Sequence, residues 1–200
     1  MKTFLYISIG LTVVFIVSQA FISGSMSKIE KYKYTVLKEF DDFEVRQYEV
    51  AMFSSVKMNA KTYEETSSSG FRVLAGYIFG GNEKNEKIAM TSPVVMEMGD
   101  TTKMSFMVPS NLKENELPKP NNGRIYFEKQ APKVMAAIRF GGWANDDRIE
   151  KYKQKLSLEL EKQGLKHTGK FNYLGYNPPY ALIARRNEVV VELVGFEMGR

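Results

Sequence analysis

The chain has 200 residues, a formal net charge of +5, one histidine and no cysteine. Without cysteine, disulfides, thiolate zinc sites and thiol catalysis are excluded. The basic residues are spread along the chain and form no block interleaved with aromatic side chains, so nucleic acid is not an expected partner.

An uncharged apolar run opens the chain over residues 4–22. A helix needs about 20 apolar residues to cross a bilayer, and this run just reaches that length. Ser18-Gln19-Ala20 also has the small-x-small pattern of a signal-peptide cleavage site. We therefore expect residues 1–26 to be a hydrophobic helix that serves as a signal peptide or a membrane anchor. Residues 27–200 should then form one domain outside the cytoplasm.

Two segments of this domain share one pattern. Residues 43–58 (FEVRQYEVAMFSSVKM) and residues 126–140 (YFEKQAPKVMAAIRF) each predict a strand, a tight bend and a second strand that forms a hairpin with the first. The proline-containing segment 109–122 lies between the two patterns and is typical of a linker. The repeat predicts that the domain is built from two similar halves.

The first half continues with a helix. Thr62 and Glu65 have the spacing of a capping box, in which two side chains satisfy the free amides of the first turn. Gly80-Gly81 predicts the end of the helix, because glycine adopts the left-handed cap without steric cost. The apolar stripe that should pack on a sheet consists of Phe71, Leu74, Ala75 and Ile78.

A methionine-bearing segment follows this helix. Pro93 is expected to open a strand over residues 91–94, where its missing N–H costs least, and another strand is expected over 104–108. Flexible thioethers suit a wall that touches a flat apolar ligand. Methionine at strand spacing more often fills a core, and we interpret these residues as core beneath the first helix. They are Met90, Met96, Met98, Met104 and Met107.

The second half repeats this order. Its helix should begin at Asn145, with Asp146 and Asp147 favourably placed at the positive end of the helix dipole, and should end at Gly164. Its buried stripe consists of Ile149, Tyr152, Leu156 and Leu160. A proline-led strand over residues 177–180 and a last strand over 189–194 are expected to follow.

Strand-strand-helix-strand-strand, occurring twice, predicts an α+β fold. Pairing the two halves into one curved, barrel-like antiparallel sheet would remove most free sheet edges. Such a duplicated fold leaves a cleft between its halves, and clefts between subdomains are where ligands bind.

Several separate motifs in one order resemble the SOUL-type haem-binding proteins. They are FEVRQYE (43–49), GYIFGGN (76–82), IAMTSPV (88–94), FMVP (106–109), FGGWA (140–144), YNPP (176–179) and RRNEV (185–189). The resemblance implies a distorted antiparallel barrel of two βαββ-like halves with two helices. It also implies non-covalent binding of haem or another tetrapyrrole in a carrier or buffering role, without enzymatic activity. An exported or membrane-linked form is one variant of this family.

The resemblance also implies site residues. The haem site is associated with the outer surface of the first helix, where Phe71 would stack on the ring, although Phe71 and Ala75 also fit a core role. Arg185 and Arg186 would pair with the propionates, or one of them would form an ion pair with Glu188. The full set of expected cofactor-binding residues is Ser68, Phe71, Ala75, Tyr180, Arg185 and Arg186.

No metal ligand is expected from the chain, and the axial ligand of a bound haem stays open. His167 lies in the polar stretch GLKHTGK, which predicts a surface turn between helix and strand. A second hypothesis is a module that binds amphipathic cations, with Glu97 and Glu188 as the candidate acids. A hydrolase acting in the cleft is the weaker third, because no Ser-His-acid spacing, metal cluster or phosphate loop is present, and nothing selects a pair such as Glu39 with Glu44.

Overall fold

The computed structural model describes residues 6–7, 9–12, 14, 18–19, 24, 29–99, 101–178 and 180–197. Only short pieces of the apolar run 4–22 are among them, so the expected N-terminal helix lies largely outside the described residues. None of the helices in the described ranges is both long and apolar enough to cross a membrane.

The elements follow the predicted order with additions at the start. The first half contains β1 (Glu30–Lys31), β2 (Tyr34–Glu39), β3 (Glu44–Tyr48), β4 (Ala51–Met58), α2 (Tyr63–Ile78), β5 (Thr91–Ser92), β6 (Val94–Glu97) and β7 (Thr102–Met107). The linker carries a short 3-10 helix, η1 (Glu114–Glu116). The second half contains β8 (Tyr126–Gln130), β9 (Lys133–Phe140), α3 (Asp146–Lys162), β10 (His167–Gly175) and β11 (Asn187–Leu193).

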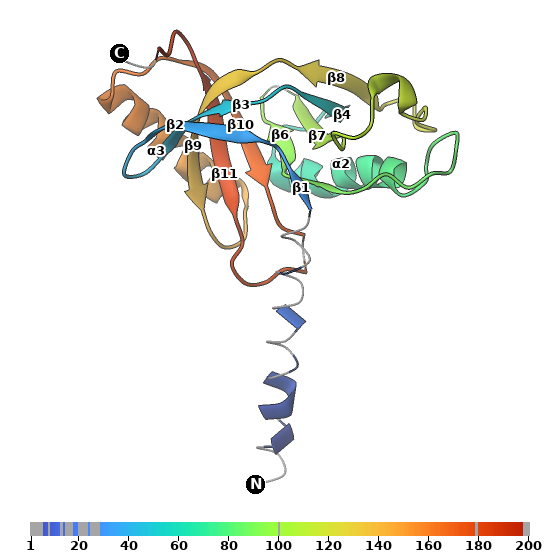
Figure 1. The fold of residues 1–200 in the computed structure, drawn as a ribbon. Coiled ribbons are helices and arrows are strands. Elements are labelled where there is room, and N and C mark those ends of the chain that lie inside the picture. Colours follow the sequence, from blue (N-terminus) through green and yellow to red (C-terminus); the bar gives the residue numbers. More distant parts are fainter. Residues whose placement is uncertain are drawn as a thin grey trace.

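Within the described residues, nine strands form one antiparallel sheet in the order β2-β3-β9-β11-β10-β6-β7-β4-β8. The strands β3, β4, β6 and β7 of the first half are equivalent to β8, β9, β10 and β11 of the second half. Between β3 and β8, strands at equal distances from the two ends of this order are equivalent, so the sheet has the symmetry of a duplicated fold. The duplication predicted from the sequence is therefore confirmed. The sheet curls into a half-barrel, with β2 and β8 at its two edges (Figure 1).

The two predicted hairpins are wrong. β3 pairs with β9, and β4 pairs with β8, so the first strand of each half adds to the sheet of the other half. The connecting residues explain the difference. Two-residue hairpins favour Asn-Gly or Gly-containing turns, which need a positive φ. Here the connections are Glu49-Val50 and Ala131-Pro132, which do not favour such a turn.

The predicted proline-led strand of the second half is also wrong. The strand after α3 begins at His167, and residues 177–180 belong to the connection between β10 and β11. Proline cannot donate to a strand ladder, and here Pro178 follows the end of β10. In the first half Pro93 lies between β5 and β6, close to the predicted position.

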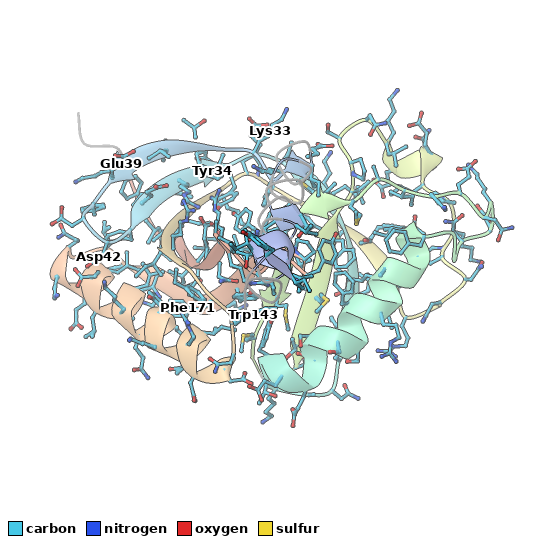
Figure 2. All side chains as sticks on the ribbon, turned by 90° about the horizontal axis from the view of Figure 1, so that it is seen from below. Lys33, Tyr34, Glu39, Asp42, Trp143 and Phe171 are labelled. Carbon is cyan, nitrogen blue, oxygen red and sulfur yellow. The ribbon has the colours of Figure 1, made fainter. Side chains whose placement is uncertain are left out.

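Both helices lie on one face of the sheet (Figure 2). Leu74 and Ile78 of α2 and the Ile149, Leu156 and Leu160 side chains of α3 are buried in the core between the helices and the sheet. We call this side the helix face. The opposite face of the sheet carries a second buried cluster that includes Tyr48, Phe53, Met107 and Val190.

Candidate ligand-binding site

A pocket of about 390 Å³ opens on the helix face, between the two halves. Its wall combines the outer side of α2 with β6 and β7 of the first half, and the end of β10 with Trp143 and Arg185 of the second half. Figure 2 shows Trp143 between the two helices. The position agrees with the predicted cleft between halves, and the volume is in the range of small-molecule sites, about 300–1,000 Å³.

The wall of the pocket is mostly apolar. Phe71 is 42% exposed and packs edge-on against Phe106, with ring centroids 5.3 Å apart. The buried thioethers of Met96 and Met104 line it from below, and Met90 is exposed beside them. An exposed aromatic ring over buried thioethers is a surface that a flat apolar ligand can cover.

This arrangement refines the interpretation of the methionines. Met96 and Met104 are in the core beneath the helices, as expected, and they also reach the pocket. Met98 packs against the same core. Met107 is also a core residue, but it lies in the cluster on the opposite face and not beneath α2. The core interpretation is wrong for Met90, which is exposed.

Arg185 holds the outer wall of the pocket together. Its Nη1 donates to the carbonyl oxygens of Pro178 (2.9 Å) and Ala181 (2.7 Å), and its Nη2 donates to that of Asn177 (3.4 Å). Its guanidinium lies 4.1 Å from the centre of the Trp143 ring, as in a cation–π contact. The Nε of Arg185 is buried and has no hydrogen-bond partner within the described part of the chain.

The two helices begin side by side at the pocket. Thr62 caps α2 and Asn145 caps α3, each accepting a hydrogen bond from the backbone amide three residues on. This confirms the cap at Asn145 and the Thr62 half of the predicted capping box. The carboxylate of Asp146, the first residue of α3, also accepts hydrogen bonds from the amides of Tyr63 (2.6 Å) and Glu64 (3.2 Å) in α2. The helix of one half is thus capped by the helix of the other, which fixes Tyr63 in the pocket wall.

Tyr173 forms part of the same wall. Its ring lies edge-on to that of Tyr63, with centroids 5.2 Å apart, and its hydroxyl donates to Asn187 Oδ1 at 2.7 Å. Burial raises the pKa of Tyr173 far above its ordinary value. The phenol is therefore a neutral hydrogen-bond donor at physiological pH, not a phenolate that would attract a metal.

A buried ionic cluster lies on the opposite face of the sheet. Glu188 is fully buried and accepts hydrogen bonds from Arg46 (2.8 and 3.2 Å), Arg186 (2.9 and 2.7 Å) and the hydroxyl of Tyr176 (2.9 Å). Burial alone would raise the pKa of the Glu188 carboxyl, but the hydrogen bonds and charges of Arg46 and Arg186 lower it below its usual range. We call Arg46, Glu188, Arg186 and Tyr176 the arginine–glutamate cluster.

The structure brings four of the six expected cofactor-binding residues together. Ser68, Phe71, Tyr180 and Arg185 all line the pocket. Phe71 is therefore not a core residue. Ala75 is buried in the core beneath α2, and Arg186 is committed to the arginine–glutamate cluster, so neither lies on the pocket wall.

The other candidates lie elsewhere. His167 is the first residue of β10, not part of a turn, and its ring packs against Phe171 away from the pocket. Glu97 forms an ion pair with Lys103 at 3.0 Å. Glu39 and Glu44 are register partners on adjacent strands, but Glu44 is bonded to Arg46 at 2.6 Å. Across the described ranges no group of three or more His, Asp or Glu residues could hold a metal ion.

Four aromatic residues of the pocket were not singled out as binding residues in the sequence: Tyr63, Trp143, Tyr173 and Tyr176. Trp143 lies within the FGGWA motif, which was a usable signal. Tyr63 and Tyr173 come from opposite halves, and only the shared cap at Asp146 and the sheet topology place them together.

The comparison with protein families matches the SOUL heme-binding protein family over residues 29–192. The chain therefore belongs to this family. Heme-binding protein 1 of Xenopus laevis is 30% identical over 155 residues, which covers 74% of this chain and 81% of that protein. Heme-binding protein 2 of Homo sapiens is 30% identical over 156 residues, covering 74% of this chain and 76% of that protein.

Solved structures with much lower identity share the fold. The C-terminal domain of EcmrR has a TM-score of 0.60 at 10% identity, covering 82% of this chain and 99% of that one. A protein from Listeria innocua described as a hydrolase has a TM-score of 0.55 at 10% identity, covering 86% of this chain and 97% of that one. Identities this low show a common architecture and carry nothing about ligand or reaction.

Proposed function

We propose that the pocket on the helix face binds haem or a related tetrapyrrole non-covalently, in a carrier or buffering role without catalysis. The observation that carries the proposal is an apolar pocket, walled by Phe71, Trp143 and buried thioethers, in a member of the SOUL heme-binding protein family. A tetrapyrrole is a large flat apolar disc, and these side chains offer it area on both sides of the cleft.

The polar groups of the pocket fit the acidic edge of such a ligand. The buried Nε of Arg185 has no partner in the described part of the chain, and a propionate oxygen would supply the acceptor it lacks. Ser68 lies on the same wall, is exposed and carries no charge. A second propionate beside Ser68 would therefore face water. Bound haem would bring an iron centre; among the described residues no histidine lines the pocket to ligate it.

The alternative of a module for amphipathic cations is less well supported. Such a site needs an unpaired acid in an apolar cleft. Glu188 is the buried acid, but Arg46 and Arg186 already neutralise it, and Glu97 is paired with Lys103. The pocket itself is lined by no acidic residue among those described.

We further propose that residues 1–26 export the domain or hold it at a membrane, outside the cytoplasm. Support comes from the uncharged apolar run 4–22. Expression of the full chain followed by membrane fractionation and mass measurement would separate the two forms. An intact chain in the membrane fraction indicates an anchor, a shortened soluble chain indicates a cleaved signal, and an intact soluble cytoplasmic chain would refute both.

Haem binding can be tested by titrating hemin into residues 27–200 and following the Soret band. We expect saturable one-to-one binding. Phe71→Ala should weaken it about tenfold, which corresponds to about 1.4 kcal/mol, because the ring on the pocket wall is lost. Phe79→Ala is the matched control, since Phe79 is 56% exposed just beyond α2 and does not line the pocket.

His167→Ala should leave the affinity unchanged, because this side chain packs against Phe171 outside the pocket. Loss of binding in His167→Ala would overturn the proposed site. Equal binding by all four proteins and by an unrelated basic protein would mean adventitious adsorption of hemin and would refute the proposed function.

A further inference from the structure

Exposed apolar side chains line the pocket and continue along the connection between β10 and β11. Met90, Trp143 and Tyr180 line the pocket, and Leu182 and Ile183 follow Tyr180 in that connection. Trp143 is 51% exposed, Tyr180 59%, Leu182 47%, Ile183 54% and Met90 48%. We call these five residues the apolar rim. Single exposed apolar residues are normal on a protein surface, but several of them at and beside one pocket are typical of a contact surface.

Charge is missing from the segments that carry the rim. Residues 88–96, 140–144 and 172–184 contain no Asp, Glu, Lys or Arg, although charged residues make up 26% of the whole chain. The first charged residue after the last of these segments is Arg185, whose guanidinium lies against the ring of Trp143. An uncharged surface with a tryptophan and a tyrosine beside a basic residue has the composition of a protein surface at a membrane interface.

The N-terminal segment meets the domain at this same place. Gln19 is buried, and its Oε1 accepts a hydrogen bond from the backbone amide of Leu182 at 3.0 Å. The described apolar residues before it are exposed and extend away from the domain, next to the connection between β10 and β11 (Figure 1). Tyr6, Ile7, Ile9, Leu11 and Val14 are among them, each more than half exposed.

We propose that the apolar rim rests on a phospholipid bilayer, so that the mouth of the pocket opens at the lipid surface. If the N-terminal run enters the bilayer, the Gln19–Leu182 hydrogen bond places residues 180–183 at the membrane surface. Apolar side chains at such a surface enter the boundary between headgroups and acyl chains by about 5–10 Å. An apolar ligand would then exchange between pocket and bilayer without crossing water.

The inference rests on the proposed membrane attachment and not on haem binding. The chain offers its own probe, because Trp143 is its single tryptophan and belongs to the rim. The full chain is reconstituted into phosphatidylcholine vesicles, with or without bromine on the upper acyl chain, and flotation is measured beside Trp143 emission. We expect the protein to float with the vesicles, and Trp143 to be blue-shifted and quenched by the brominated lipid.

A pair of double variants tests whether the rim makes the contact. Leu182→Ser with Ile183→Ser should still float, through the N-terminal segment, but should lose the quenching of Trp143. Val50→Ser with Leu158→Ser removes two equally exposed aliphatic residues outside the rim, 51% and 57% exposed, and should keep it. Circular dichroism and the Soret titration check that both variants fold, which is expected because all four positions are exposed.

Each other result overturns the inference. A chain that floats with Trp143 unquenched is anchored by its N-terminal segment alone. A chain that does not float lacks the proposed membrane attachment. The haem proposal is independent of this result, because hemin titration of residues 27–200 tests it separately. Equal quenching in both double variants would mean that the rim does not make the contact.

Discussion

The two faces of the sheet hold their polar groups in different states. On the face opposite the helices, Glu188 is enclosed by Arg46, Arg186 and Tyr176, and every one of these groups is paired within the domain. On the helix face, the pocket has an apolar wall and the Nε of Arg185, for which the described residues offer no hydrogen-bond partner. A fully paired charge is part of the structure, whereas unfilled apolar space beside an unsatisfied donor is where a ligand gains free energy.

Tyr176 connects the two regions. Its hydroxyl donates to Glu188, and the residue is also part of the pocket lining. The arginine–glutamate cluster therefore supports one wall of the pocket from behind. Changes in the cluster should mainly alter stability, and changes in the pocket should mainly alter binding.

The largest expected effect comes from breaking the cluster. Glu188→Gln leaves Arg46 and Arg186 buried against a neutral amide, which should lower the free energy of unfolding by about 3–5 kcal/mol. Glu97→Gln breaks a partly exposed ion pair with Lys103 and should cost only about 0–1 kcal/mol. Urea denaturation of residues 27–200 measures both. Equal, small losses would show that the cluster contributes nothing special to stability.

The same cluster should give a pH dependence of stability. Because the pKa of Glu188 is lower in the folded protein than its ordinary value of 4.5, its contribution is complete above pH 4.5. It is lost as pH falls below that value, through the lower pKa of the folded state. The stability difference between wild type and Glu188→Gln should therefore shrink below pH 4.5. A difference that stays constant or grows under acid would contradict this assignment.

A smaller effect is expected where the halves join beneath the pocket. Asp146→Ala removes the carboxylate that caps the first turn of α2 and should cost about 1–2 kcal/mol of stability. Hemin affinity should fall with it, since Tyr63 loses its fixed position. Asp147→Ala removes the same charge from an exposed neighbour and should change both quantities less. Thermal unfolding and the Soret titration compare them, and equal effects would mean that only the charge matters.

Local sequence signals predicted a good part of this molecule. The helices, their caps and the duplication follow from apolar periodicity and capping residues, which act over a few positions. The strand pairing could not be predicted from these local signals. The residues of the bends at Glu49-Val50 and Ala131-Pro132 do not determine which strand the next strand pairs with. Register across halves is a property of the whole sheet.

The resemblance to the SOUL family predicted a site on the outer side of α2, and this is right for two of the three residues it named there, because Ala75 is buried in the core. Ser68 and Phe71 share the outer side of α2, and both line the pocket. The two arginines of RRNEV could not be told apart in the same way. The two arginines are adjacent, yet Arg185 lines the pocket and Arg186 belongs to the arginine–glutamate cluster. The backbone at the end of the β10–β11 connection determines which side of the sheet each side chain reaches. The membrane attachment stays a prediction from the apolar run.

The most direct test fills the pocket without disturbing the fold. Ser68 and Ser69 are adjacent and both exposed on α2, but only Ser68 lines the pocket. Ser68→Trp should place its ring in the pocket and weaken hemin binding at least about tenfold, or about 1.4 kcal/mol, while Ser69→Trp should bind as the wild type does. If both variants bind hemin equally well, the haem site does not lie in this pocket.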